Sequence, residues 1–138
     1  MPFDFAHDSF SPASDLRSAR QRRGARSHLT GLAAEDAVCR RYLAAGYDLV
    51  ARRKRCPEGE IDLLLRQGGV LVAVEVKSST THHLAWEHAT EAQLTRVSMA
   101  CERCMLEMAG DGIADMRLDL ALVDARGRVE VMEAFIHY

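Results

Sequence analysis

The stretch EIDLLLRQGGVLVAVEVK, residues 60–77, contains two apolar runs separated by Gly68-Gly69. A two-residue glycine link between such runs is a strong hairpin signal, because both central positions of a type I′ turn require positive φ. The sequence therefore predicts antiparallel strands over residues 60–67 and 70–77. One face of this hairpin is apolar and is expected to pack on the core: Ile61, Leu63, Val72, Val74 and Val76.

The simplest register of this hairpin gathers charged residues at its open end. If the two glycines form the loop, Asp62 faces Glu75 and Glu60 faces Lys77, and opposed residues project from the same face. Two opposed carboxylates raise each other's pKa, so a cation is expected between them. Lys77 supplies one charge, and oxygen ligands on adjacent strands also suit a divalent metal. An exposed strand face with an ordinary Glu60–Lys77 ion pair is the alternative interpretation.

Periodic patterns on both sides of the hairpin predict the other elements. These are helices over residues 28–45 and 90–108, strands over 47–53, 117–124 and 128–135, and loops over 54–59 and 78–86. The order helix, three strands, helix, two strands predicts an α/β sandwich around one central mixed sheet, with a helix on each side.

Length and composition favour one globular domain. The chain has 138 residues, of which 48% are hydrophobic and 28% charged, and this is enough for one core and too little for two. No apolar run approaches the roughly 20 residues that span a bilayer, and the N-terminus lacks the order of a signal peptide. The sequence predicts a cytoplasmic protein without membrane association. In that compartment Cys39, Cys56, Cys101 and Cys104 are expected to be free thiols rather than disulfides or a zinc site.

Charge is distributed unevenly along the chain. Residues 17–55 hold 11 Lys/Arg and 3 Asp/Glu, whereas residues 56–138 hold 7 and 14. This polarity suits a protein that presents positive surface to a polyanion and concentrates carboxylates elsewhere, as a metal-dependent nuclease does. A solvated basic tail is the alternative. We expect residues 1–27 to form a mostly disordered basic arm and residues 28–138 to form the folded domain.

The hairpin residues also resemble those of a known family. Asp62, followed after twelve residues by Glu75-Val76-Lys77, resembles the Asp and Glu-X-Lys signature of restriction-endonuclease-like nucleases. More closely, residues 59–64 and 74–77 resemble the two central motifs of the YraN family, small bacterial proteins similar to archaeal Holliday junction resolvases. The remaining matches follow in order: Gly31, Ala34-Glu35, Gly46-Tyr47, Arg55-Cys56, Ala100, Arg117-Leu118-Asp119 and Glu133-Ala134-Phe135. The resemblance covers roughly residues 28–135 and implies a restriction-endonuclease-like sandwich.

The resemblance further implies a nuclease that depends on Mg²⁺ or Mn²⁺ and hydrolyses phosphodiester bonds in DNA, with branched repair or recombination intermediates as expected substrates. Asp62 and Glu75, with the backbone carbonyl of Val76, would bind the metal. Lys77 would orient the attacking water and offset negative charge in the transition state.

Two helix residues are implied as further members of this site. Glu35 would support the metal from the first helix or hold a second one, and Gln93 would align water or phosphate from the second helix. The alternative for both is a surface role, with Glu35 paired to Arg40 or Arg41. Ser79 stands where the family usually has a second basic residue, and this departure affects substrate grip rather than metal binding.

Nucleic-acid contacts are predicted for Arg52, Arg53, Lys54 and Arg55, which lead directly into the hairpin. The expected partner is branched or structured DNA, or RNA. A four-way junction would favour a homodimer, since two symmetric cuts need two sites. Two alternatives without catalysis remain: a nucleic-acid-binding module that kept the fold, and an adaptor that contacts a repair or recombination protein through the arm.

Overall fold

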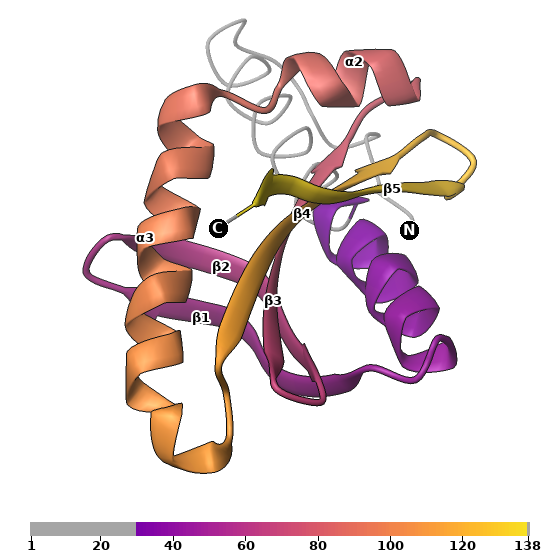
Figure 1. The fold of residues 1–138 in the computed structure, drawn as a ribbon. Coiled ribbons are helices and arrows are strands. Elements are labelled where there is room, and N and C mark those ends of the chain that lie inside the picture. Colours follow the sequence, from indigo (N-terminus) through magenta and orange to yellow (C-terminus); the bar gives the residue numbers. More distant parts are fainter. Residues whose placement is uncertain (1–29, 138) are drawn as a thin grey trace, which may run out of the picture.

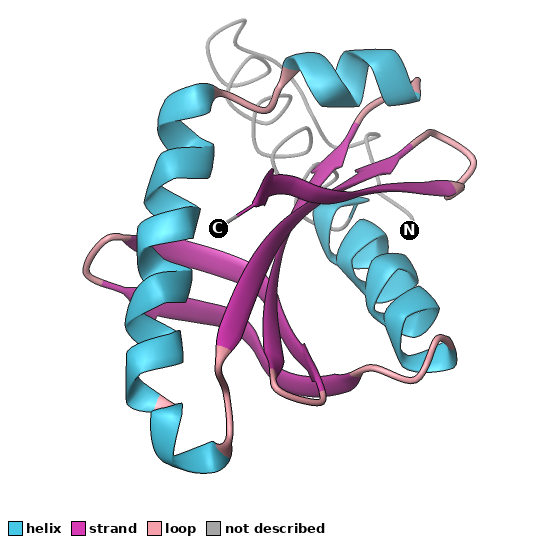
Figure 2. Cartoon of the chain, viewed as in Figure 1, coloured by secondary structure: helices cyan, strands magenta, loops and turns pink. Residues whose placement is uncertain are grey.

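A five-stranded sheet runs through the part of the chain that the computed structural model describes, residues 30–137 (Figure 1). The strands lie in the order β1-β2-β3-β4-β5, with β3 and β4 parallel and the other neighbours antiparallel. Long helices flank this sheet on opposite sides, as Figure 2 shows. The elements are a first helix of residues 30–44, β1 (Asp48–Cys56), β2 (Gly59–Gln67), β3 (Val70–Ser78), α2 (His82–Glu87), α3 (Glu91–Glu107), the 3-10 helix η1 (Ala109–Asp111), β4 (Asp115–Val123) and β5 (Val129–His137). The predicted α/β sandwich with a mixed sheet is confirmed.

The central hairpin of β2 and β3 forms with the predicted register. Pairing runs from Gln67 opposite Val70 to Leu63 opposite Val74. Gly68 has a φ of 58°, whereas the second glycine of the link does not have positive φ. Only the first turn residue therefore has positive φ, as in a type II′ turn, whereas the predicted type I′ turn requires positive φ at both residues.

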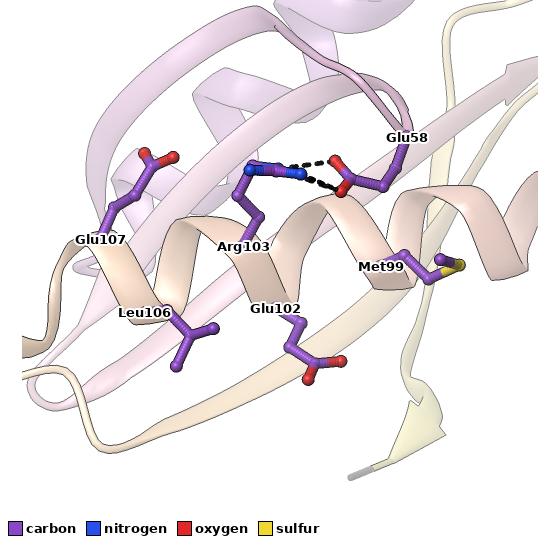
Figure 3. Close-up of a pocket in the computed structure, with 6 residues that line it drawn as sticks. All are labelled: Glu58, Met99, Glu102, Arg103, Leu106 and Glu107. Carbon is purple, nitrogen blue, oxygen red and sulfur yellow. Dashed lines mark hydrogen bonds and ion pairs between the residues drawn. The ribbon is translucent and has the colours of Figure 1, made fainter.

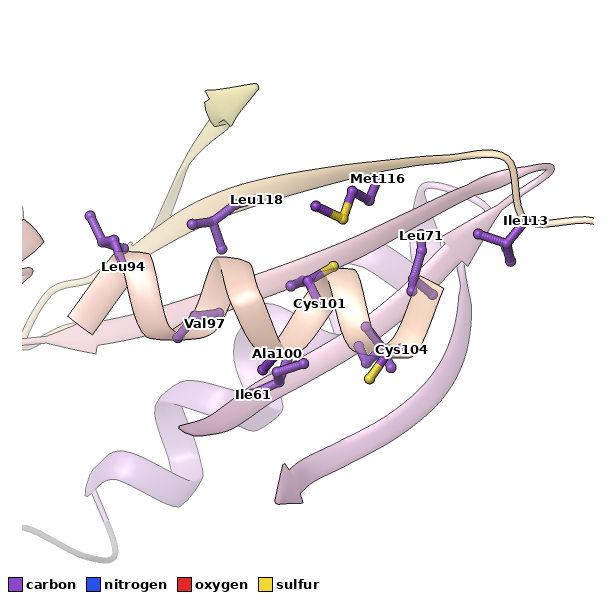
Figure 4. Close-up of a cluster of buried hydrophobic side chains, with 12 residues drawn as sticks. Ile61, Leu71, Leu94, Val97, Ala100, Cys101, Cys104, Ile113, Met116 and Leu118 are labelled. Atoms are coloured by element: carbon purple, nitrogen blue, oxygen red, sulfur yellow. The ribbon is translucent and has the colours of Figure 1, made fainter. Parts of the chain in front are cut away.

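The α3 helix covers one face of the sheet. It begins after Thr90, whose hydroxyl oxygen accepts the backbone N–H of Gln93 at 3.2 Å and so caps the first turn. Its apolar side chains pack on β2, β3 and β4 (Figure 4), and each fully buried leucine there contributes about 1.5–3 kcal/mol. The buried members of this cluster are Ile61, Leu64, Leu71, Ala73, Leu94, Val97, Ala100, Cys101, Cys104, Ile113, Met116 and Leu118.

The first helix covers the opposite face. Its buried residues are Ala34, Val38, Cys39 and Tyr42, and they pack against Leu63, Leu65, Val72, Val74, Ala121 and Val123 of the sheet. Because both faces of β2 and β3 are buried, the central strands lie in the middle of the protein. Any polar side chain at their ends must then find a partner or a pocket.

The connection between the parallel strands β3 and β4 carries α3 to its face. Parallel neighbours cannot be joined by a tight turn, so the chain crosses over through α2 and α3. The sequence analysis treated residues 78–86 as a loop, and this prediction was wrong for most of the segment. Thr81 caps α2 by accepting the N–H of Leu84 at 3.1 Å, and Ala85 is fully buried. One cap and one buried alanine are enough to stabilise this single short helix in its tertiary context.

The edge strand β1 is longer than predicted. Lys54 and Arg55 lie on the strand, paired with Ile61 and Glu60, and were wrongly assigned to a loop. The charged sequence of this segment does not predict a strand, but pairing with β2 supplies its backbone hydrogen bonds. An edge strand also tolerates charged side chains well. The run of basic residues therefore lies along the rim of the sheet.

Ile61 packs on a different face from the one predicted. Strict alternation from Leu63 would place it toward the first helix, but it belongs to the cluster beneath α3. The β2–β3 pairing ends at Leu63 and Val74, and β2 continues with β1 as its ladder partner. The simple alternation that the prediction assumed is therefore broken between Leu63 and Ile61, where β2 no longer pairs with β3.

The predicted arm of residues 1–27 and the predicted first residues of the first helix lie outside the described residues. Within residues 30–137 no helix is both long enough and apolar enough to cross a bilayer. All four cysteines are free thiols, as predicted.

Candidate active site

Asp62, Glu75 and Gln93, which come from β2, β3 and α3, line one pocket of about 220 Å³. The other residues that line it are Gly59, Glu60, Arg96 and Val97. The structure thus brings together three of the residues that the sequence analysis assigned to one site. The pocket lies where β2 and β3 stop pairing, beside the first turns of α3.

Asp62 is held by the neighbouring strand. Its Oδ2 accepts the backbone N–H of Val76 at 2.8 Å. The predicted ladder pairs of Asp62 with Glu75 and of Glu60 with Lys77 do not form, because the regular pairing ends one step earlier. A side-chain hydrogen bond takes the place of strand pairing there, and it still holds Asp62 beside the strand that carries Glu75.

Glu75 is buried with only 4% of its surface exposed. Burial is the largest cause that raises its pKa to about 9, followed by a hydrogen bond with Asp62 and the charge of that residue. The positive charge of Lys77 opposes this rise. Near neutral pH the Glu75 carboxyl group is therefore protonated in the absence of another cation.

Lys77 lies at the edge of this pair. Its Nζ is 3.9 Å from Oε1 of Glu75, and 19% of its side chain is exposed. One ammonium at that distance does not neutralise two carboxylates, as the raised pKa of Glu75 shows. Lys77, the last residue of the Asp and Glu-X-Lys pattern, therefore lies beside the carboxyl pair of Asp62 and Glu75.

The donor set fits a hard divalent cation. Asp62 and Glu75 supply carboxylate oxygens, the Val76 peptide adjoins them, and a dication would displace the proton of Glu75. Among residues 30–137 no group of three His, Cys, Asp or Glu side chains is arranged as a ligand set. Magnesium commonly takes only one or two carboxylates and fills its other positions with water and substrate phosphate. This chemistry matches a site with two carboxylates.

Glu35 does not line the pocket. It is buried on the first helix and accepts two hydrogen bonds from Arg53, with Nε 3.0 Å from Oε1 and the terminal nitrogen 3.3 Å from Oε2. The alternative pairing with Arg40 or Arg41 was wrong. The charges of Glu60 and Asp62 also raise the pKa of Arg53, after the larger contribution of Glu35. Arg53 therefore lies between Glu35 and the pocket.

The basic run has several partners within the fold. Arg52 donates to Asp36 at 2.7 Å, and Arg53 is held by Glu35. Arg55 has 90% of its side chain exposed, and its Nε lies 3.6 Å from Glu60. Arg52 and Arg53 thus join β1 to the first helix, while Arg55 is the guanidinium of this run that extends furthest into solvent.

Arg96 is a pocket residue that the sequence analysis did not identify. It lies three residues after Gln93, so both side chains lie on the same side of α3. That spacing was available in the sequence, but nothing there indicated which face of the helix meets the carboxylates. No histidine in the described part of the chain lines this pocket; His82, on α2, contacts the backbone carbonyl of Arg128 at 2.9 Å.

A larger groove of about 400 Å³ lies along the outside of α3 (Figure 3). It shares no lining residue with the carboxylate pocket. Its guanidinium, from Arg103, is already paired with Glu58 at 2.8 Å, and exposed Met99 and Leu106 make up its apolar part. The groove therefore lacks the paired carboxylates that distinguish the smaller pocket.

Comparisons with known proteins agree on one family. A model described as uncharacterised protein family UPF0102 matches residues 34–123, which include every residue that lines the carboxylate pocket. A UPF0102 protein of Ruegeria pomeroyi is 45% identical over 116 residues, 83% of this chain and 94% of that protein. A UPF0102 protein of Dinoroseobacter shibae is 43% identical over 119 residues, covering 86% and 89%. One from Cereibacter sphaeroides is 39% identical over 107 residues, covering 78% and 92%.

Proposed function

The chain belongs to the uncharacterised protein family UPF0102, and from the geometry of its pocket we propose that it is a metal-dependent endonuclease. The reaction is hydrolysis of phosphodiester bonds in DNA, with Mg²⁺ or Mn²⁺ held by Asp62, Glu75 and the backbone carbonyl of Val76. Branched DNA, as an intermediate of repair or recombination in the cytoplasm, is the proposed substrate.

The observation that carries this proposal is the buried carboxyl pair. Glu75 is almost fully enclosed, its pKa is raised to about 9, and its neighbour is a second carboxyl group. Such a pair costs stability and is rarely retained in a core without a compensating cation or a use for the shifted pKa. Lys77, whose Nζ lies 3.9 Å from Oε1 of Glu75, supports a hydrolytic role over a purely structural one.

Each side chain has a distinct part in the proposed reaction. A bound divalent cation supplies positive charge that acidifies a water molecule and stabilises the phosphate as attack proceeds. Asp62 is pre-oriented by the Val76 N–H, and Glu75 gives up its proton when the cation binds. Lys77 donates hydrogen bonds that orient the attacking water and offset the charge of the transition state. Gln93 donates its amide N–H to phosphate or accepts from water.

Cleavage of a panel of labelled linear, nicked, flap and four-way DNAs tests this proposal. The native protein should cut at least one of them with Mg²⁺ or Mn²⁺ and none with a chelator. Glu75→Ala should abolish cutting, whereas Glu102→Ala, which removes an exposed carboxylate of α3 outside the pocket, should not. Cutting that survives in Glu75→Ala would refute the site assignment.

A non-catalytic nucleic-acid-binding or adaptor role is the second candidate. It is favoured by the raised pKa of Glu75, because a protonated Glu75 leaves the pocket with less negative charge when no metal is bound. This candidate predicts binding of DNA or RNA, or of a repair protein through the arm, with no cutting under any divalent metal. For a four-way junction the nuclease proposal extends to a homodimer, in which two sites make two symmetric cuts.

A further inference from the structure

Arg96 is the cationic member of the residues that line the carboxylate pocket. Among residues 30–137, no carboxylate oxygen lies within ion-pair distance of its guanidinium. Arg53 and Arg117 are paired with carboxylates elsewhere in the fold, Arg53 with Glu35 at 3.0 Å and Arg117 with Asp119 at 2.8 Å. Arg96 is exposed and lines the carboxylate pocket. Because its charge has no carboxylate partner among the described residues, it is available for a ligand.

The backbone around Arg96 is held close to the pocket. A Cβ added to Gly59 would lie 3.4 Å from Cβ of Arg96, so the start of β2 and this turn of α3 are in close contact. The Thr90 cap sets where α3 begins, and Gln93 and Arg96 follow on one side of it. The guanidinium therefore leaves the helix from a fixed point beside Asp62 and Glu75.

The charges of the pocket define the ligand that Arg96 can take. Glu60, Asp62 and Glu75 provide three carboxylates, and Lys77 adjoins them. Glu60 is already paired with Arg55, whose Nε lies 3.6 Å from it, and one divalent cation would offset the charges of Asp62 and Glu75. Lys77 and Arg96 would then be positive charges in excess, which suits the negative charge of a phosphodiester. Its planar fork of N–H donors also matches two phosphate oxygens.

We propose that Arg96 binds a phosphodiester group of the nucleic-acid backbone at the mouth of the pocket and positions it against Gln93 and the carboxylates. This inference deepens the proposed nuclease function and rests on it for the cutting step, but its binding part concerns nucleic acid alone. Arg96 thereby provides the substrate grip for which Ser79 offers no basic side chain.

The binding test is made in a Glu75→Gln background, so that the DNA stays intact and the pocket needs no cation. Fluorescence anisotropy of a labelled four-way DNA, with chelator present, is followed over a range of salt concentrations. Arg96→Met keeps an apolar stem against Gly59 and removes the charge, Arg96→Lys keeps the charge, and Arg66→Met removes the same charge at the hairpin end of β2. Thermal melting checks that each variant is folded.

Arg96→Met should weaken binding several-fold and reduce the slope of log affinity against log salt by about 0.9, the value for one lost phosphate contact. Arg96→Lys should retain most of the slope, and Arg66→Met should leave it unchanged. In the native background with Mg²⁺, Arg96→Met should raise KM more than it lowers kcat. Equal slopes for Arg96→Met and its parent, or a parent that binds no DNA, would overturn the inference. If Arg96→Met reduces the slope relative to its parent as expected, but the native protein cuts none of the DNAs, the nuclease proposal is refuted and the Arg96 contact is retained.

Discussion

The backbone N–H of Val76 donates a hydrogen bond to Oδ2 of Asp62 at 2.8 Å, one step beyond the last regular pair of β2 and β3. This bond joins two strands at the point where they separate. It also orients the Asp62 carboxylate by the backbone of β3, the strand that carries Glu75. This single contact therefore fixes where the two carboxyl groups of the candidate site lie relative to each other.

Substitutions of Asp62 should separate orientation from charge. Asp62→Asn keeps an oxygen acceptor for the Val76 N–H, whereas Asp62→Ala leaves that part-buried donor without its partner. We expect Asp62→Ala to lower the free energy of unfolding by about 1–3 kcal/mol and Asp62→Asn to lower it less. Both should abolish metal-dependent cutting. Urea unfolding and the cleavage panel measure the two effects, and full activity in Asp62→Asn would contradict the proposed role of its charge.

Stability should fall with rising pH because of Glu75. Its pKa is about 9 in the folded protein against a usual value of 4.5, so between these values the folded state keeps a proton that the unfolded chain has released. The contribution is therefore fully present below pH 4.5 and is lost as pH rises toward 9. The slope from one such group is at most about 1.4 kcal/mol per pH unit. Glu75→Gln should flatten the stability curve over this range, whereas Glu102→Gln should run parallel to the native protein.

Metal binding should release a proton from the carboxyl pair. At neutral pH Glu75 is protonated in the metal-free protein, and a ligand carboxylate must be ionised. Calorimetric titration with Mn²⁺ in two buffers of different ionisation enthalpy should report release of about one proton, and binding should strengthen toward pH 9. Glu75→Gln should lose this release. Tight binding without proton release in the native protein would place the metal elsewhere.

The Glu35–Arg53 pair should stabilise the contact between the first helix and β1. Arg53 has a φ of 52°, a left-handed conformation that is unfavourable for an arginine or alanine and costs a glycine little. Arg53→Gly should thus be less destabilising than Arg53→Ala by about 1 kcal/mol, although both lose the ion pair. A double-mutant cycle with Glu35→Ala, read by chemical denaturation, should give a favourable coupling energy between the two residues. A coupling near zero would show that the pair contributes nothing to the fold.

The approach of Asp62 to Glu75 could be predicted from the sequence, because a two-residue glycine link and a strand period of two set the register along the hairpin. The end of regular pairing after Leu63 could not be predicted in this way. A counted register sets which residues face each other next to the turn, but it carries no information about where the two strands separate. The position of Ile61 beneath α3 follows from the same divergence.

The helix that supplies Gln93 was predictable from its apolar period and its Thr90 cap. The sequence did not predict which polar residues of this helix line the pocket, so Arg96 was missed. The partner of Glu35 was missed for a related reason: Arg53 lies on another element, and its positive φ leaves no mark in the sequence pattern.

By itself the sequence determined the order of the five strands and the two long helices, the hairpin of β2 and β3, and the proximity of Asp62, Glu75 and Lys77, since turn chemistry and periodicity act over a few residues. Only the tertiary structure decided how far each strand extends and which basic side chains form ion pairs. It also decided that Arg96 lines the pocket without a carboxylate partner among the described residues. These outcomes depend on burying both faces of one sheet beneath two helices. The packing that buries both faces of the sheet brings together side chains that are distant in the chain. Ion pairs between such side chains form only when the tertiary structure has formed.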